Sequence, residues 1–153
     1  MGILTADMQR LVRAQRLGYV ATVCPDGTPN LSPKGTVTVW DDDHLVFADI
    51  RSPRTIANLR HNPVLEINVV DPFSRLGYRF KGAATILDRG DLFDRIVAFY
   101  REQGSESTIR RVVLVEVIRA LPLRSPAYDQ PVTEAEVRAR WERIYLGERA
   151  REP

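Results

Sequence analysis

The sequence contains almost no cysteine: Cys24 is the only one in 153 residues. An intrachain disulfide is therefore impossible, and zinc sites that need several cysteine ligands are excluded. A lone thiol usually packs as a small hydrophobic side chain, so we expect Cys24 to be structural. Such sparing use of cysteine is typical of a reducing compartment, and we expect a cytoplasmic protein.

Long hydrophobic runs are also missing. No stretch approaches the roughly 18 consecutive apolar residues of a membrane-spanning helix, so we expect no membrane span. The first ten residues lack the basic start and apolar core of a secretory signal, so we expect no signal peptide. The formal net charge is only +2, which argues against a dedicated nucleic-acid-binding protein.

Common catalytic and nucleotide-binding sequence motifs are absent as well. There is no GxSxG, HExxH, GxxxxGK[ST] or GxGxxG motif in the chain. The two histidines, His44 and His61, lie in predicted turns away from other ligand-type residues, and we expect no metal site. The sequence identifies no catalytic residue, so any chemistry would have to come from a bound cofactor.

What remains is an ordinary globular composition, with 44% of the residues hydrophobic and 27% charged. This length and composition suit one domain with its own core, and we expect residues 1–153 to form it. Thr5 predicts the N-cap of a helical start over residues 5–15. A capping box from Thr133 to Glu136 predicts a helical tail over residues 132–146.

Between these two ends, short segments alternate polar and apolar residues at the spacing of hairpins. The predicted strands cover residues 18–23, 36–40, 45–48, 64–70, 78–87 and 111–121. A tight turn at Pro25–Thr28 predicts a further hairpin strand, and two helices interrupt the series, over residues 52–61 and 91–103. About six strands with few helices between them predict a mainly β, antiparallel sheet or barrel with peripheral helices.

One segment has the composition of an anion site. Ser52 is a good N-cap and Pro53 suits the first helical position, so a helix N-terminus with free N–H groups is expected there. Arg51 and Arg54 add guanidinium groups, and Ser52 and Thr55 add hydroxyls, all of which can bond to a phosphate. The alternative is a capped helix whose arginines are only solvated, and these residues alone leave both interpretations open.

Lysine is scarce, because only Lys34 and Lys81 among the 22 basic residues are lysines, and both precede a glycine. Positions that keep lysine favour a compact ammonium over a planar guanidinium. The segment Ser32–Gly35 enters the strand next to the anion site, and it can bring the Lys34 ammonium to the same edge.

Several segments, taken in order, resemble the pyridoxamine 5′-phosphate oxidase-like, FMN-binding split-barrel family. They are Leu17–Val23, Asp26–Asn30, Ser32–Gly35, Phe47–Asp49, Arg51–Leu59 with Asn62 and Pro63, and Tyr78–Ala84. The resemblance covers residues 15–90. It implies a six-stranded antiparallel Greek-key split β-barrel and a homodimer with FMN sites at the interface.

The resemblance also implies roles for individual residues. Ser52, Arg54 and Thr55, with Arg51 beside them, would hold the FMN phosphate. The remaining cofactor-binding positions are Lys34, Gly35, Thr36 and Val37 along the flavin ring, Ala48 and Asp49 flanking it, and Arg79 and Lys81 reaching it from the partner subunit. Asn58 would brace the phosphate loop.

The implied function is an FMN-dependent oxidoreductase that acts on a small molecule by hydride transfer at flavin N5. Alternatives that stay open are the deazaflavin F420 as cofactor and a non-catalytic electron carrier or redox sensor. A haem-binding barrel is disfavoured by the placement of both histidines in turns. The tail from residue 123 does not match that of the true oxidases, so vitamin B6 phosphates are not the expected substrates. Tyr128 and Trp141 in this tail either pack it onto the barrel or cover the partner's flavin.

Overall fold

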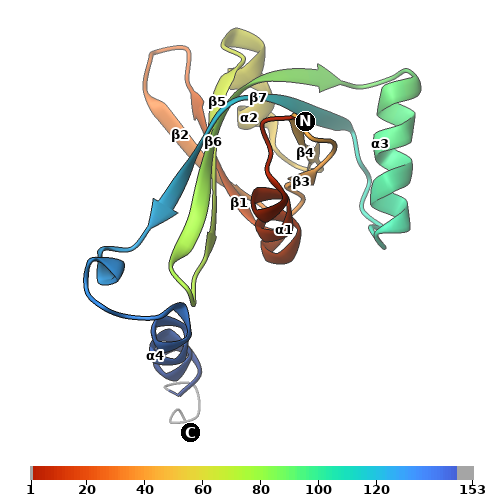
Figure 1. The fold of residues 1–153 in the computed structure, drawn as a ribbon. Helices are drawn as coiled ribbons and strands as arrows, with labels where there is room; N and C mark the ends of the chain where they lie inside the picture. Colours follow the sequence, from red (N-terminus) through yellow and green to blue (C-terminus); the bar gives the residue numbers. More distant parts are fainter. Residues whose placement is uncertain (1, 148–153) are drawn as a thin grey trace, which may run out of the picture.

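A curled antiparallel sheet of seven strands runs through residues 2–147, which are the residues that the computed structural model describes (Figure 1). Met1 and residues 148–153 of the expected domain lie outside this range. The strand order is β2-β1-β5-β6-β7-β4-β3. The strands are β1 Gly18–Val23, β2 Pro29–Lys34, β3 Thr38–Val39, β4 His44–Asp49, β5 Val64–Asp71, β6 Leu76–Leu87 and β7 Arg111–Arg124. The sheet curls into a half-barrel, which confirms the mainly β split-barrel prediction. It has seven strands where six were expected.

Four α-helices accompany the sheet within residues 2–147. They are α1 Ala6–Gln15, α2 Pro53–His61, α3 Asp91–Glu102 and α4 Glu134–Gly147, and a 3-10 helix, η1, covers Pro126–Asp129. Figure 1 shows α4 projecting from the end of the sheet farthest from α2. The predicted caps form: Thr5 Oγ1 accepts a hydrogen bond from the Met8 N–H, and Thr133 and Glu136 exchange hydrogen bonds as a capping box. No helix within residues 2–147 has the length and apolar character needed to cross a membrane.

The main core fills the inside of the curl. Alternate side chains of the sheet point inward there, including the fully buried Val20, Ile67 and Phe80, as the period-2 pattern requires. Helices α1 and α2 cover them with Val12 and Ile56. Full burial of such a side chain is worth about 1.5–3 kcal/mol, so this core fixes the two helices that border the site.

A second, smaller core lies on the outer side of β4 and β7. Ile96 and Tyr100 of α3 pack there against Val46, Ala48 and Val112. This packing holds the end of α3 beside β4 and the segment that leads into β3.

The strand expected over residues 36–40 is short, because only Thr38 and Val39 pair with β4. The side chain of Thr36 takes the place of a main-chain partner: its Oγ1 accepts from the Ala48 N–H at 2.9 Å. The Tyr100 hydroxyl donates to the Thr36 carbonyl at 2.8 Å. Residues 35–37 are therefore held in place outside the regular sheet.

The tail packs onto the β5–β6 turn of its own chain. The Tyr128 hydroxyl donates to the Ser74 carbonyl at 2.6 Å. The Arg75 guanidinium lies 3.5 Å from the centre of the Trp141 ring, in the geometry of a cation–π contact. Of the two interpretations of Tyr128 and Trp141, packing of the tail onto the barrel matches these contacts.

Candidate cofactor site

Lys34 ends β2 with its ammonium drawn into the protein. The residue is 8% exposed, and its Nζ donates to Ser32 Oγ at 2.9 Å and to Ser52 Oγ at 2.6 Å. Burial lowers the pKa of Lys34, and the nearby Asp49 carboxylate opposes that shift. The positive charge of Lys34 is thus fixed beside the first residues of α2.

Ser52 stands at the N-cap position of α2, as predicted, but its side chain does not cap the helix. The hydroxyl accepts from Lys34 instead. Pro53 follows in the first turn and has no N–H of its own. The remaining N–H groups of the first turn therefore have no side-chain cap, and with the helix dipole they favour an anion. We call Lys34, Ser52 and the first turn of α2 the Lys34–Ser52 cradle.

Asp49 anchors the loop that carries this cradle. It is 2% exposed, accepts from the Ser52 N–H at 2.9 Å and forms an ion pair with Arg111 at 3.0 Å. The register of β4 with β7 places Asp49 directly opposite Arg111. Sequence reasoning missed Arg111, because the first residue of a distant strand carries no local sign of its partner.

The other residues of the predicted phosphate loop gather around the cradle. Arg51 and Arg54 are exposed, and neither forms a salt bridge within residues 2–147. Thr55 is buried. Asn58 is also buried and donates to Thr22 Oγ1 at 3.0 Å, so it ties α2 to β1 and does not reach a ligand.

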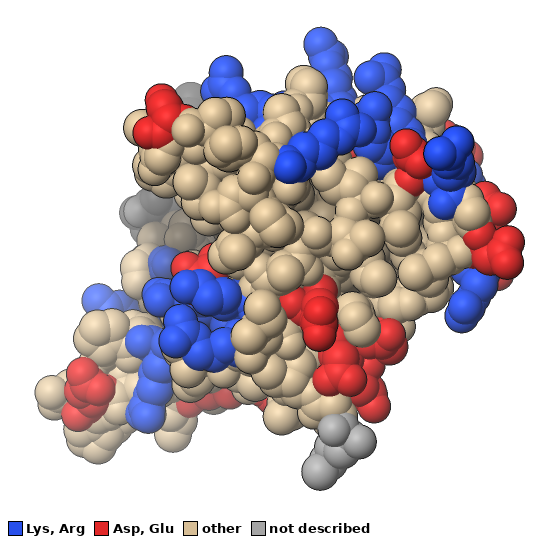
Figure 2. Space-filling model, turned by 90° about the horizontal axis from the view of Figure 1, so that it is seen from above, with Lys and Arg blue, Asp and Glu red and all other residues tan. Residues whose placement is uncertain are grey.

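The charges of this region favour a phosphate. One carboxylate, Asp49, lies near two cations, Lys34 and Arg111, while Arg51 and Arg54 form no salt bridge within residues 2–147, so the region near the helix N-terminus keeps a net positive charge. Figure 2 looks onto the end of the molecule where α2 lies and shows several basic side chains along one edge of an uncharged area, with acidic side chains on other parts of its border. The groups present fit the phosphate of a flavin mononucleotide in charge and in donor type.

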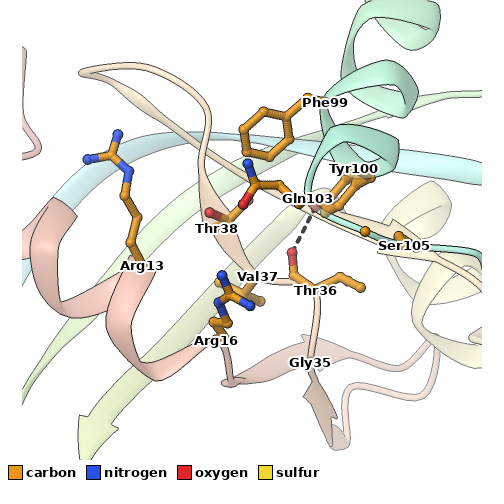
Figure 3. A pocket seen from close by; sticks show the side chains of 11 residues that line it. Arg13, Arg16, Gly35, Thr36, Val37, Thr38, Phe99, Tyr100, Gln103 and Ser105 are labelled. Atoms are coloured by element: carbon orange, nitrogen blue, oxygen red, sulfur yellow. Dashed lines mark hydrogen bonds between the residues drawn. The ribbon is translucent and has the colours of Figure 1, made fainter.

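Next to the cradle, Gly35, Thr36, Val37 and Thr38 form one wall of a cavity of about 480 Å³ (Figure 3). The other walls come from Arg13 and Arg16 at the end of α1, and from Phe99, Tyr100, Gln103, Gly104 and Ser105 at the end of α3. We call this space the α1–α3 cavity. Its volume lies within the range of small-molecule sites, about 300–1,000 Å³.

Sequence reasoning placed the residues 35–37 at the cofactor and missed the residues on the two helices. Arg13 and Phe99 stand more than 80 positions apart in the chain, and only the fold brings them to one space. The arginines offered no signal, because arginine is common throughout this sequence.

Arg79 and Lys81 do not meet the cradle within one chain. They lie on β6 and alternate with the buried Phe80, so their side chains are on the outer face of the sheet. Their cross-strand neighbours also lie on that face: Asn68 and Leu121 stand opposite Arg79.

The outer face of β1, β5, β6 and β7 is uncovered by any helix in residues 2–147, apart from the part under α3. Large hydrophobic side chains are exposed on these strands and on β2; they are Tyr19, Leu31, Val64, Ile118 and Leu121. Charged and polar side chains, among them Arg79 and Lys81, stand between them, so this face is mixed in character.

Comparison with known proteins identifies the family. The family model described as pyridoxamine 5′-phosphate oxidase matches residues 4–144. The chain belongs to this family. No curated protein sequence matches the chain closely enough to count as a relative.

Several solved structures are similar to this one. HupZ from Group A Streptococcus is 34% identical, with a TM-score of 0.71, and the match covers 79% of this chain and 94% of HupZ. An FMN-binding protein from Syntrophomonas wolfei is 19% identical, with a TM-score of 0.67 and coverage of 80% and 87%. A protein described as F420 reductase is 22% identical, with a TM-score of 0.57 and coverage of 76% and 98%. The last two share the fold with this chain.

Proposed function

We propose that this chain is an FMN-binding oxidoreductase that acts on a small molecule by hydride transfer at flavin N5. The observation that carries the proposal is the meeting of a buried ammonium with an uncapped helix N-terminus in the Lys34–Ser52 cradle. A structural lysine would be expected to pair with a carboxylate. Lys34 instead bonds two hydroxyls and leaves its charge available to an anion.

In this proposal, the cradle and Arg54 hold the phosphate, and residues 35–37 provide the edge along which the flavin ring lies. Bound FMN supplies the capacity to accept or donate a hydride at N5. The protein supplies a fixed polar edge, because Thr36 is held from both sides by Ala48 and Tyr100. Fixed donors and acceptors cost little reorganisation when a ligand's charge changes.

The proposal includes a homodimer. The uncovered outer face, with Tyr19, Leu31 and Leu121, supplies apolar surface for a second copy of the chain. Arg79 and Lys81 lie on the same face and would reach the partner's flavin once two sheets meet. An interface there gives these two residues a role that they lack in one chain.

A flavin-binding electron carrier or redox sensor is the second candidate. One observation favours it: the residues that line the α1–α3 cavity include no His, Asp, Glu, Lys or Cys within residues 2–147. The buried Tyr100 is no substitute, because burial raises the pKa of its hydroxyl far above the usual value. With F420 in place of FMN, the exposed Arg51 and Arg54 would meet a longer anionic chain.

The visible absorption spectrum of the purified protein tests the proposal, with FMN and F420 titrated in parallel into any cofactor-free fraction. We expect the bands of bound FMN at about 370 and 450 nm, reduction by NADH or NADPH, and oxidation of the reduced protein by a small-molecule acceptor. Binding of F420 alone would replace FMN in the proposal. Binding of FMN without turnover of any acceptor would favour the carrier, and binding of neither cofactor would overturn the flavoprotein assignment.

A further inference from the structure

The α1–α3 cavity contains positive charge that the flavin proposal does not use. Arg13 and Arg16 stand at the end of α1, three residues apart, and both side chains line the cavity. Figure 3 shows the Arg16 side chain extending from the end of α1 toward Val37 and Gln103, with Arg13 farther out on the α1 side.

Neither arginine has a partner of opposite charge. Within residues 2–147, no salt bridge includes Arg13 or Arg16. No acidic residue lines the cavity in that part of the chain either. Arg16 beside Val37, with Arg13 farther out on the same side of the cavity and no carboxylate among the described lining residues, favours an anionic ligand with planar oxygen acceptors.

The backbone at Arg16 fixes the position from which its side chain starts. Arg16 is the C-cap of α1 and adopts a left-handed conformation with φ of 52°. This is a common way for a helix to end, and the Arg16 N–H bonds to the Val12 carbonyl there. A glycine would fit this turn without strain, but the chain places a long cation there.

The wall opposite the arginines is apolar and rigid. Phe99 is held edge-to-face by Trp40 and Tyr100, with ring centroids 6.0 and 5.6 Å away. Tyr100 is itself tied to the Thr36 carbonyl. A flat or aliphatic group of a ligand would therefore meet a surface that is already in place.

We propose that the α1–α3 cavity binds the small-molecule substrate, and that this substrate carries a carboxylate or phosphate held by Arg13 and Arg16 while its apolar body lies against Phe99. The inference rests on the proposed function, because residues 35–37 are both a cavity wall and the proposed edge for the flavin ring. It goes beyond that function by naming the substrate class: small organic anions with an apolar or flat body.

Phenyl phosphate, benzoate and phenol are suitable probes, because they share a ring and differ in the anionic group. Each is titrated into the FMN-loaded protein, and the amide NMR signals of Gly35, Gly104 and Ser105 report on the cavity. We expect phenyl phosphate, benzoate or both to shift these signals saturably and phenol to bind at least about tenfold more weakly. Comparison of the first two probes tells which anionic group the cavity prefers.

Arg16→Gln keeps the aliphatic stem and removes the charge, and we expect it to weaken binding of the preferred anion about tenfold or more. Arg89→Gln is the matched control, because Arg89 is 94% exposed and lies outside the cavity. The bound-flavin absorption bands should be the same in both variants. The absorption bands report on FMN binding alone, so they distinguish a failure of anion binding in the cavity from a failure of the proposed flavin binding.

Three outcomes would overturn the inference. In the first, phenol binds as tightly as the anions. In the second, Arg16→Gln binds the anions like the wild-type protein. In the third, the anions displace FMN, or Arg16→Gln loses FMN, in which case the cavity belongs to the cofactor and the flavoprotein assignment still stands. Failure of the wild-type protein to bind FMN at all would overturn the proposed function instead.

Discussion

The Lys34–Ser52 cradle and the α1–α3 cavity adjoin each other along residues 34–38, yet their positive charges are held in opposite ways. In the cradle, the charge of Lys34 is buried and bonded to hydroxyls, and Asp49 and Arg111 brace the loop. In the cavity, the charges of Arg13 and Arg16 are exposed and unpaired in the described chain. The difference fits the two proposals, in which a resident cofactor occupies the braced cradle and an exchangeable substrate occupies the cavity.

The largest expected effect is on the free energy of unfolding, and it should differ between a variant in the cradle and a variant in the cavity. Asp49→Ala leaves the Arg111 guanidinium and the Ser52 N–H without their shared partner, so we expect the free energy of unfolding to fall by about 2–3 kcal/mol. Arg16→Gln removes an exposed charge and should change it by less than about 0.5 kcal/mol. Urea unfolding of both variants measures the difference. Equal stability of the two would contradict the structural role of the cradle.

The second effect is on flavin affinity. Lys34→Met removes the buried ammonium but keeps most of the stem, and the loss of a charge-assisted hydrogen bond to phosphate should weaken FMN binding about 10- to 100-fold. Arg16→Gln should bind FMN as the wild-type protein does. Fluorescence titration with FMN gives both affinities. Unchanged FMN affinity in Lys34→Met would remove Lys34 from the site.

The third effect is a difference in pH dependence. Because burial lowers the pKa of Lys34, its charged fraction falls at a lower pH than that of a free lysine near 10.5. FMN affinity should therefore begin to decrease with rising pH before a free lysine would lose its charge, whereas anion binding in the cavity should stay constant over the same range, since arginine does not titrate there. Lys34→Met is the control that reveals any pH dependence of FMN itself. An identical slope in the variant would show that Lys34 is not the titrating group.

The smallest effect concerns the segment that both regions share. Tyr100→Phe removes the hydrogen bond to the Thr36 carbonyl and leaves the ring in place. We expect a loss of about 1 kcal/mol in the free energy of unfolding and a few-fold weakening of both FMN and anion binding. Scanning calorimetry of this variant measures the free energy of unfolding, and titration calorimetry measures the affinities for FMN and for the anion. Weaker binding of only one of the two ligands would mean that residues 35–37 contact that ligand alone.

The sequence predicted the cradle better than the cavity, and the reason is physical. Ser52 and Arg54 stand in one short segment at a helix start, and local chain geometry dictates that such groups lie together. Even so, the prediction gave Ser52 the wrong hydrogen bond, because the partner that replaces the capping N–H is Lys34, 18 residues away.

Long-range partners are the part that could not be predicted. Arg111 meets Asp49 only through the register of β4 with β7, and Phe99 reaches Arg16 only because α3 packs on the outer side of the sheet. No local pattern encodes either contact. The shortening of β3 has the same origin, since Thr36 exchanges its main-chain pairing for a side-chain bond to Ala48.

The most direct test of the account compares FMN with riboflavin, which has the same ring without the phosphate. The wild-type protein should bind FMN at least about 100-fold more tightly than riboflavin, and Arg54→Ala should remove most of that difference by weakening FMN alone. Arg60→Ala, at the other end of the same helix, should leave the difference between FMN and riboflavin affinity unchanged. Equal affinity of the wild-type protein for FMN and riboflavin, or an unchanged ratio in Arg54→Ala, would contradict a phosphate site at the start of α2.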